Sequence, residues 1–222
     1  MLSNIRIVLV EPSHPGNIGA AARAMKNMCL EHLYLVSPEK YPHVDASARA
    51  AGADDVLDAA VVTDSLQAAV ADCAMVLGAS ARLRTLNWPQ YDPRQAAEEA
   101  SKASQTSRVA IVFGRERTGL TNDELDLCHY LVHISCNEQF SSLNLAAAVQ
   151  VLSYEIFVAH QHKPRQKIIE DTEIPANQLE MQRFYQHLEN TLIKIDFLDP
   201  DQPKKLMRRL RRLYNRAQPE QT

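Results

Sequence analysis

The sequence predicts an α/β fold in which one parallel sheet is followed by a small helical extension. Short runs rich in valine, isoleucine and leucine alternate with alanine-rich stretches of helical period over about the first 160 residues. This alternation is the pattern of strands joined by crossover helices. The 222 residues suffice for one ordinary domain with a remainder, and 45% hydrophobic against 23% charged residues is typical of a folded globular chain.

The main domain is expected to contain six strands that form one sheet. Strands are expected at 5–10, 33–36, 60–62, 75–79, 109–113 and 131–134. Helices are expected between them at 18–28, 45–51, 65–71, 93–104 and 121–127, and a longer helix at 143–159 closes the unit. Thr121 and Glu124 have the spacing of a capping box, which favours a helix start at that point.

A domain boundary is expected at 160–167, where the sequence HQHKPRQK brings charge and a proline and has no apolar period. We therefore expect a main domain at 1–160, a linker at 161–176 and a helical, basic extension at 177–222. Within the extension, a helix is expected near 177–195, a turn at 199–203 and a terminal helix at 204–216, with a leucine stripe of Leu206, Leu210 and Leu213 that packs on the domain or on a dimer.

Composition also excludes several classes of protein. No apolar run reaches the ~20 residues of a membrane span, and Glu11 interrupts the N-terminal apolar segment too early for a signal peptide. We therefore expect a cytoplasmic protein with no membrane partner. The four cysteines have no close pair, which indicates neither a zinc site nor a disulfide framework, and all four are expected to be buried apolar residues. They are Cys29, Cys73, Cys128 and Cys136.

Positive charge is concentrated at the C-terminal end. Residues 204–222 hold seven basic residues and one acidic residue, net +6, whereas residues 1–203 hold 17 basic and 26 acidic residues, net −9. The seven are Lys204, Lys205, Arg208, Arg209, Arg211, Arg212 and Arg216. Such polarity favours an anionic partner at the basic end, nucleic acid before all others. A solvated basic face and a membrane-surface helix are the alternatives.

Five of the six glycines lie at or just beyond the carboxyl end of an expected strand. Ligands bind at that edge of open α/β sheets, because backbone amides are free there. Gly16 and Gly19 could begin a dinucleotide fingerprint, but no third glycine follows at the right spacing and no acidic residue closes the second strand. A Walker loop is also absent, so nicotinamide and nucleoside-triphosphate chemistry are disfavoured.

Three motifs follow one another in the main domain: PGNIGAAAR at 15–23, IVFGRERTGL at 111–120 and SSLNLAA at 141–147. In this order they resemble the trefoil-knotted RNA methyltransferases of the SPOUT class. That class shows Asn-x-Gly followed by an arginine, then Phe-Gly-x-Glu-x-x-Gly-Leu, then Ser-Leu-Asn before the last helix. The resemblance implies that 1–160 is a SPOUT methyltransferase domain with a C-terminal trefoil knot, a topology that periodicity alone would make improbable.

Within the class, the segment GASAR at 78–82 and the length of the extension resemble tRNA ribose 2′-O-methyltransferases. The resemblance implies S-adenosyl-L-methionine as cofactor without a metal, tRNA as partner, and a homodimer with the active site near the subunit interface. The implied target is nucleotide 32 of the anticodon loop. A knotted RNA-binding protein without turnover, and an enzyme acting on another tRNA position or on ribosomal RNA, are the alternatives.

The site residues are carried over motif by motif. The catalytic residues expected are Arg23, Ser142 and Asn144. The cofactor-binding residues expected are Ala79, Ser80, Ala81, Gly114, Ile134, Ser141, Ser142 and Leu143. The residues expected to fix the loops are Asn17, Glu116 and Gly119. RNA contacts are expected from Arg82, Arg84, Lys204, Lys205, Arg208, Arg209, Arg211 and Arg212, with Trp88 as a candidate that could equally pack its own loop.

Arg23 lies opposite the apolar face of its helix, so it is expected to point away from the core. It could reach a partner subunit's cofactor loop and stabilise a developing alkoxide, because its pKa above ~12 makes it a poor general base. A solvated arginine is the alternative. Ser142 could orient the substrate or cap the following helix. Glu116 could bind backbone amides of its loop, or be a plain surface carboxylate. Gly114 is expected to let the backbone pass close to a ligand.

Overall fold

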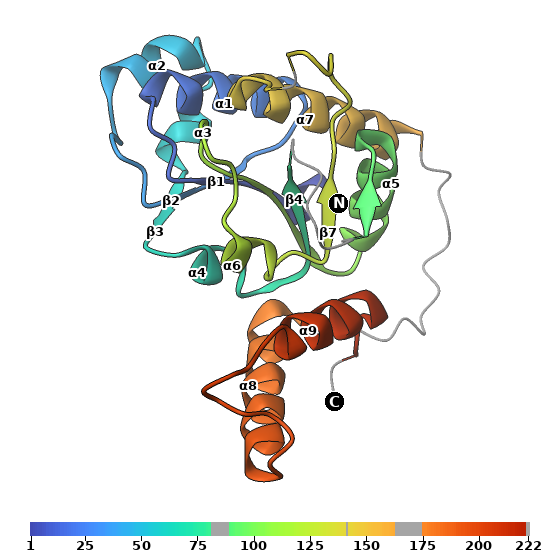
Figure 1. The fold of residues 1–222 in the computed structure, drawn as a ribbon. Coiled ribbons are helices and arrows are strands. Elements are labelled where there is room, and N and C mark those ends of the chain that lie inside the picture. Colours follow the sequence, from blue (N-terminus) through green and yellow to red (C-terminus); the bar gives the residue numbers. More distant parts are fainter. Residues whose placement is uncertain (81–88, 141, 163–174, 221–222) are drawn as a thin grey trace.

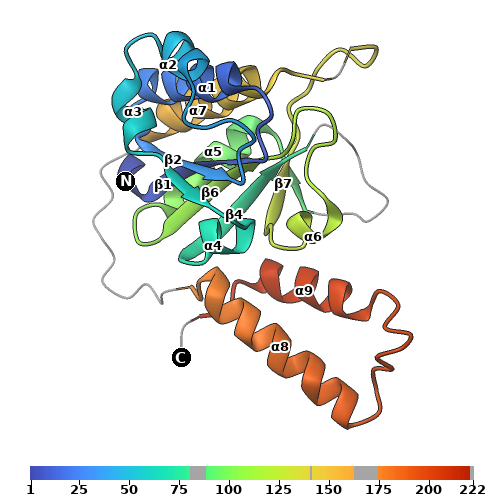
Figure 2. The ribbon, with the colours of Figure 1, turned by 90° about the vertical axis from the view of Figure 1, so that its left-hand side faces the viewer.

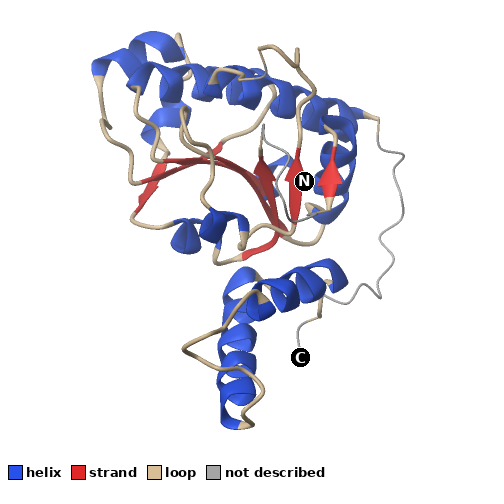
Figure 3. Ribbon diagram, viewed as in Figure 1, coloured by secondary structure: helices blue, strands red, loops and turns tan. Residues whose placement is uncertain are grey.

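The computed structural model describes residues 1–80, 89–140, 142–162 and 175–220. A seven-stranded sheet with all neighbours parallel runs through the main domain in the order β3-β2-β1-β6-β4-β7-β5. Helices cover both faces of the sheet, and two further helices form a separate hairpin below it (Figure 1, Figure 3). The predicted α/β class with a helical extension is confirmed.

The strands lie close to the predicted ranges, with one addition. They are β1 (Ile5–Val10), β2 (His32–Val36), β3 (Val61–Thr63), β4 (Cys73–Ala79), β5 (Gln90–Tyr91), β6 (Arg108–Phe113) and β7 (Tyr130–Val132). The expectation of six strands is wrong, because β5 pairs with β7 at the sheet edge. Two residues are too few to show an apolar period, so the sequence pattern contains no signal for β5.

The helices of the main domain also follow the prediction within a few residues. They are α1 (Pro15–Asn27), α2 (Val44–Ala50), α3 (Asp54–Asp58), α4 (Leu66–Val70), α5 (Pro93–Ala103), α6 (Asn122–Leu125) and α7 (Leu145–Gln161), preceded by a short 3-10 turn at Leu2–Asn4. Only the five-residue α3 was not expected. The capping box of Thr121 and Glu124 is present at the start of α6.

The sheet separates two hydrophobic cores, because successive side chains of a strand point to opposite faces. In β1, Ile5, Ile7 and Leu9 pack under α1, α2, α5 and α7, whereas Val8 and Val10 pack on the side of α4 and α6 (Figure 2). All the β1 residues except Arg6 are apolar, as expected for a central parallel strand covered on both faces.

Gly19 allows two helices to pack closely, a role that its place near the end of an expected strand did not predict. It lies inside α1, and a Cβ atom there would come within 1.9 Å of the carbonyl oxygen of Ala46 in α2. The glycine therefore permits close packing of two helices and is not a strand-end turn. This packing fixes the direction of α1, which contains the first motif.

The C-terminal extension is a hairpin of α8 (Gln178–Lys194) and α9 (Leu206–Ala217) that lies beneath α4 and α6 (Figure 1, Figure 2). The Leu179 N–H donates to the Ala71 carbonyl at 2.9 Å, and the buried amide of Gln178 donates to the Leu127 carbonyl at 3.0 Å. The predicted turn lies between the helices, where the Asp201 N–H donates to the Asp199 carboxylate.

Two of the three leucines of the stripe predicted for the terminal helix pack on the chain itself. Leu206 and Leu210 are half-buried, but Leu213 is 49% exposed. The buried residue of α9 is instead Asn215, whose side-chain oxygen accepts a 2.6 Å hydrogen bond from the Tyr185 hydroxyl.

The expectation of four buried cysteines is also wrong. Cys73 and Cys128 are buried, Cys136 is half-buried and Cys29 is exposed. Cys29 adopts φ 58° just after α1. Its N–H donates to the Lys26 carbonyl, and the N–H of Leu30 donates to the Met25 carbonyl. This is a Schellman motif in which cysteine takes the place usually held by glycine. None of the described helices combines the length and apolar character needed to cross a lipid bilayer.

Candidate active site

Three loops meet at the carboxyl edge of the sheet and enclose a cavity of about 140 Å³. They follow β4, β6 and β7, which are neighbours in the sheet. The lining comprises Ala79 and Ser80 after β4, Phe113 and the loop 114–120 after β6, Val132, Ile134 and Cys136 in and after β7, and Leu143, Leu145 and Ala148 around the start of α7. One water needs roughly 10–15 Å³, so this cavity can accept a small organic ligand.

The loop 114–120 folds back on itself to form one wall of the cavity. The Gly119 N–H donates to the Arg115 carbonyl at 2.9 Å, and Gly119 has φ +69°. A Cβ atom on Gly114 would lie 2.2 Å from the Gly119 carbonyl carbon. The loop's own backbone therefore makes a close approach that requires glycine at 114, and Gly114 also lines the cavity.

Glu116 connects this loop to the first motif. Its carboxylate accepts hydrogen bonds from the Ser13 N–H at 3.2 Å, the His14 N–H at 3.4 Å and the Asn17 side-chain amide at 3.0 Å. Burial opposes ionisation of Glu116, but the bonds from Asn17 and Ser13 outweigh it and hold the pKa of the carboxyl below its usual value. Glu116 binds backbone amides, as predicted, and those of Ser13 and His14 lie just before the first motif.

Asn17 continues the connection to the third motif. Its side-chain oxygen accepts a 3.0 Å bond from the Asn144 amide, whose own oxygen accepts from the Ala146 N–H at 2.9 Å and the Ala147 N–H at 3.4 Å. Asn144 is thus the N-cap of α7, and the expectation that Ser142 could hold this place is wrong. Because an N-cap side chain accepts from the backbone amides two and three residues later, Asn144 sets where α7 begins.

The same chain matches known proteins over almost its entire length. The SpoU rRNA Methylase family matches residues 4–154, and the tRNA methyltransferase TrmJ C-terminal domain matches residues 179–222. The tRNA (cytidine/uridine/adenosine-2′-O-)-methyltransferase TrmJ of Pseudomonas aeruginosa is 54% identical over 226 residues, which cover 98% of this chain and 88% of that protein. The chain belongs to the TrmJ group of the SpoU methylase family.

Solved structures of this family share the fold. The crystal structure of TrmJ from Z. mobilis ZM4 aligns with a TM-score of 0.84 at 38% identity, covering 97% of this chain and 92% of that one. The SpoU methyltransferase AviRb from Streptomyces viridochromogenes, solved in complex with the cofactor AdoMet, aligns with a TM-score of 0.57 at 21% identity. It covers 71% of this chain and 61% of its own, and the likeness is one of fold.

In this SpoU methylase core, the predicted site residues divide into three groups. Ala79, Ser80, Gly114, Ile134 and Leu143 line the cavity, together with Glu116 and Gly119. Ser142 is exposed and does not line it. Arg23 is exposed on α1, as predicted, and forms no hydrogen bond or ion pair with any described residue. Ala81, Arg82, Arg84, Trp88 and Ser141 lie outside the described residues.

The match to the TrmJ C-terminal domain covers the basic helix, whose cations are not all free. Arg208 donates to Asp126 at 2.8 Å, and the Arg211 guanidinium lies 4.5 Å from the centre of the Tyr185 ring. These two arginines hold the extension together and to the core, which corrects the expectation that all the basic residues face outward. Exposed basic residues of this segment are Lys204, Lys205, Arg209 and Arg216.

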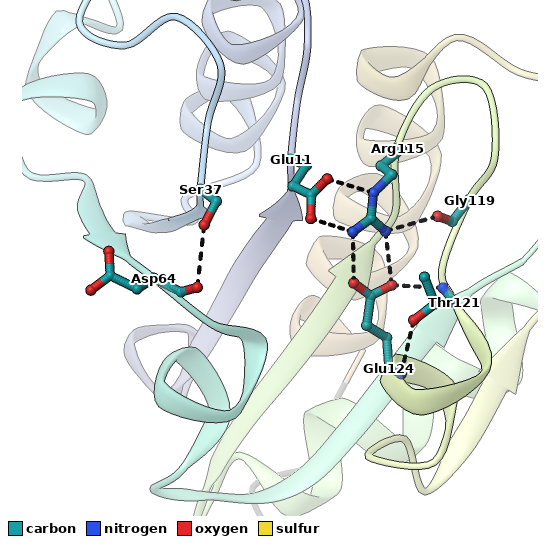
Figure 4. Close-up of polar contacts among 7 residues, drawn as sticks. All are labelled: Glu11, Ser37, Asp64, Arg115, Gly119, Thr121 and Glu124. Carbon is teal, nitrogen blue, oxygen red and sulfur yellow. Dashed lines mark hydrogen bonds and ion pairs between the residues drawn. The ribbon is translucent and has the colours of Figure 1, made fainter.

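Sequence reasoning missed one ionic cluster of this TrmJ-group site, formed by Glu11, Arg115 and Glu124 (Figure 4). Arg115 bonds both oxygens of each carboxylate: its Nε lies 2.8 Å from Glu11, and its terminal nitrogens lie 3.0 and 3.1 Å from Glu124. The hydrogen bond from Arg115 holds the pKa of Glu11 below its usual value. The capping box identified Glu124, but no local pattern connects it to Arg115. In the described ranges, no three His, Cys, Asp or Glu side chains are grouped closely enough to hold a metal ion.

Proposed function

We propose that this methyltransferase-family chain transfers a methyl group to the 2′-hydroxyl of a ribose in tRNA, at nucleotide 32 of the anticodon loop. One observation carries the proposal: the loops after β4, β6 and β7, which include the second and third motifs, converge on one cavity in a chain that matches TrmJ through both its core and its extension. TrmJ of Pseudomonas aeruginosa is named for cytidine, uridine and adenosine 2′-O-methylation of tRNA.

We propose S-adenosyl-L-methionine as the cofactor, without a metal. The cavity has apolar walls from Val132, Ile134 and Leu145 and a polar rim from Ser80 and Glu116, which fits a ligand with an aromatic base and charged groups. When bound, the cofactor supplies an electrophilic methyl group. The cofactor-binding residues in this proposal are Ala79, Ser80, Ala81, Gly114, Ile134, Ser141, Ser142 and Leu143.

Arg23 is proposed as the catalytic residue. Its guanidinium is exposed and has no partner among the described residues, so it is available to an anionic group. A ribose hydroxyl that loses its proton becomes an alkoxide, and a fixed cation beside it stabilises that charge. Ser142, also exposed, can orient the substrate. Asn144 uses one amide hydrogen on Asn17, and the second remains available to a hydroxyl.

We further propose a cytoplasmic homodimer in which Arg23 of one subunit faces the cofactor loop of the other. Arg23 does not line the cavity of its own chain, so a second copy would complete the site. The trefoil knot is proposed on the same family resemblance. tRNA is proposed to contact Arg82 and Arg84 near the site and the exposed cations of α9 at the extension.

A pair of tRNA substrates tests this function. The full-length protein is incubated with S-adenosylmethionine and either an unmodified tRNA or the same tRNA with 2′-deoxyribose at nucleotide 32. We expect one methyl group on the first RNA by mass spectrometry and none on the second. Equal methylation of both RNAs would exclude position 32, and no methylation of either would contradict the enzyme assignment.

A further inference from the structure

The loop 114–120 is held to the rest of the molecule by two neighbouring side chains, Glu116, whose bonds to Ser13, His14 and Asn17 are described above, and Arg115. All its residues line the cavity, and two of them are glycines, the residues with the greatest backbone freedom. Within the loop, the described backbone bond closes only the turn from Arg115 to Gly119. A turn closed on itself still has to be fixed to the rest of the molecule before the cavity has a defined wall.

The Arg115 side chain supplies a second attachment beside that of Glu116. Its Nε and one terminal nitrogen bond the two oxygens of Glu11, and both terminal nitrogens bond the two oxygens of Glu124 (Figure 4). The remaining N–H points at the Gly119 carbonyl at 3.5 Å. Arginine has five N–H donors in a planar fork, and here each of them has an acceptor.

The two carboxylates belong to rigid elements on either side of the loop. Glu11 directly follows β1, where its N–H donates to the Val36 carbonyl at 2.8 Å. Glu124 lies in the first turn of α6, and its carboxylate also accepts from the Thr121 N–H at 2.6 Å. Arg115 therefore joins the end of a central strand, the cavity loop and the helix that follows it.

Burial makes the contact with Glu124 stronger than an ordinary surface ion pair, because the side chains of Arg115 and Glu124 are 22% and 15% exposed. The Glu11 side chain is 46% exposed, and both pairs are bidentate. Exposed pairs contribute little, but bidentate, partly desolvated ones with fixed geometry contribute more. Arg117, two residues along the same loop, is exposed and forms no such pair with the described residues.

We propose that Arg115 is a positioning residue, which fixes the cofactor-binding shape of the loop 114–120 by bridging Glu11 and Glu124. This rests on the proposed function for the identity of the ligand, but the ordering of the loop does not. A lysine at 115 keeps the charge but is a single ammonium, which cannot bond both oxygens of two carboxylates at once. It therefore cannot replace the bridge that Arg115 makes between Glu11 and Glu124.

The test uses the full-length variants Arg115→Lys, Arg115→Gln and Glu124→Gln. The control is Arg94→Lys. Arg94 is a 75% exposed residue of α5 that pairs with Glu155 of α7 and does not line the cavity. Hydrogen–deuterium exchange of the ligand-free protein measures loop order. We expect amides at 114–121 to exchange roughly tenfold faster in all three variants, with the central strands and the control unchanged. Arg115→Lys should not restore wild-type exchange.

Calorimetry with S-adenosylhomocysteine gives the second measurement. We expect its Kd to rise roughly tenfold in the Arg115 variants, with the KM for S-adenosylmethionine rising while the KM for tRNA stays near wild type. Wild-type loop exchange and wild-type Kd in Arg115→Gln would overturn the proposal, and so would faster exchange spread evenly over the chain. No binding to the wild-type protein would contradict the proposed cofactor, whereas loop exchange would still decide the role of Arg115.

Discussion

The Asn144 amide donates to the side-chain oxygen of Asn17 across 3.0 Å, and this bond joins two motifs that are 127 positions apart in the sequence. The Asn17 amide in turn donates to Glu116 at 3.0 Å. Each asparagine thus has a fixed orientation, because rotating either amide by 180° would set donor against donor or acceptor against acceptor. The loops around the cavity are held by one continuous relay.

Asn144→Asp is expected to break this relay while keeping the cap of α7. An aspartate caps a helix as well as asparagine, but its second oxygen would face the Asn17 oxygen without a donor between them. We expect a loss of about 1–3 kcal/mol in the free energy of unfolding, measured with denaturant at neutral pH. Asn144→Ser, which keeps a capping oxygen and adds no charge, should lose less. An aspartate variant as stable as wild type would show that the relay does not contribute.

Arg23→Ala is expected to abolish methyl transfer without unfolding the protein. The side chain is exposed and unpaired within the described part of the chain, so its loss should leave the melting temperature unchanged. Removing a cation aimed at a developing alkoxide should lower kcat by roughly a hundredfold or more. Lys26→Ala removes a neighbouring cation from α1 that bonds the Gly52 carbonyl and the Asp55 carboxylate, and this control should retain activity. Near-normal turnover of Arg23→Ala would make Arg23 a solvated surface residue.

Lowering the pH is expected to destabilise the protein through one buried histidine. His129 is buried, and its Nδ1 accepts a 3.0 Å bond from the Val76 N–H. Burial lowers its pKa from 6.5 to about 4. Between pH 6.5 and 4, His129 therefore binds a proton in the unfolded chain but stays neutral in the folded protein. The free energy of unfolding falls over that interval by roughly 3 kcal/mol. Above pH 6.5 this contribution is fully present.

The pH effect is assigned by comparing two variants. His129→Asn keeps a side-chain oxygen near the Val76 N–H but cannot be protonated. Between pH 4 and 6.5, the unfolding free energy of this variant should therefore depend on pH less steeply than that of the wild type, by about 1.4 kcal/mol per pH unit. His187→Asn replaces an exposed histidine on α8 and should retain the wild-type profile. Identical profiles for His129→Asn and the wild type would assign the acid sensitivity to other groups.

Sequence patterns predicted those parts of the fold that depend on local period. The apolar runs of β1 and β6 and the capping box of α6 are visible in a few consecutive residues. The two-residue β5 and the exposed Cys29 after α1 were not, because a short edge strand and a left-handed residue leave no periodic signal. Strand order likewise depends on contacts between segments far apart.

The candidate site was likewise predictable only in part. The motifs located the loops that line the cavity, but they did not indicate which side chains hold those loops together. Glu11 and Arg115 are 104 positions apart, and nothing near either residue in the sequence specifies the other. Arg208 is a further example: its place in a basic helix predicted an outward cation, and only the docking of that helix on α6 brings it to Asp126.

Within the extension, only the exposed cations are expected to bind tRNA phosphates, whereas Arg208 is paired with Asp126. Changing the exposed Lys204, Lys205, Arg209 and Arg216 together to glutamine should weaken tRNA binding and flatten its dependence on salt, with S-adenosylmethionine binding unchanged. Each phosphate contact releases counterions, so loss of four should reduce the slope of log affinity against log salt by up to about 3. Binding is measured at several salt concentrations.

Arg208→Gln is the matched control, because it also removes a positive charge from α9 but one already neutralised by Asp126 at 2.8 Å. It should lower stability and leave the salt slope near wild type, since a cation paired within the protein releases few counterions on binding RNA. Equal slopes for the quadruple variant and the wild type would mean that α9 does not contact phosphates. The contacts would then have to come from the main domain, with Arg82 and Arg84 as the first residues to replace. A flattened slope in Arg208→Gln instead would show that the ion pair to Asp126 opens when RNA binds.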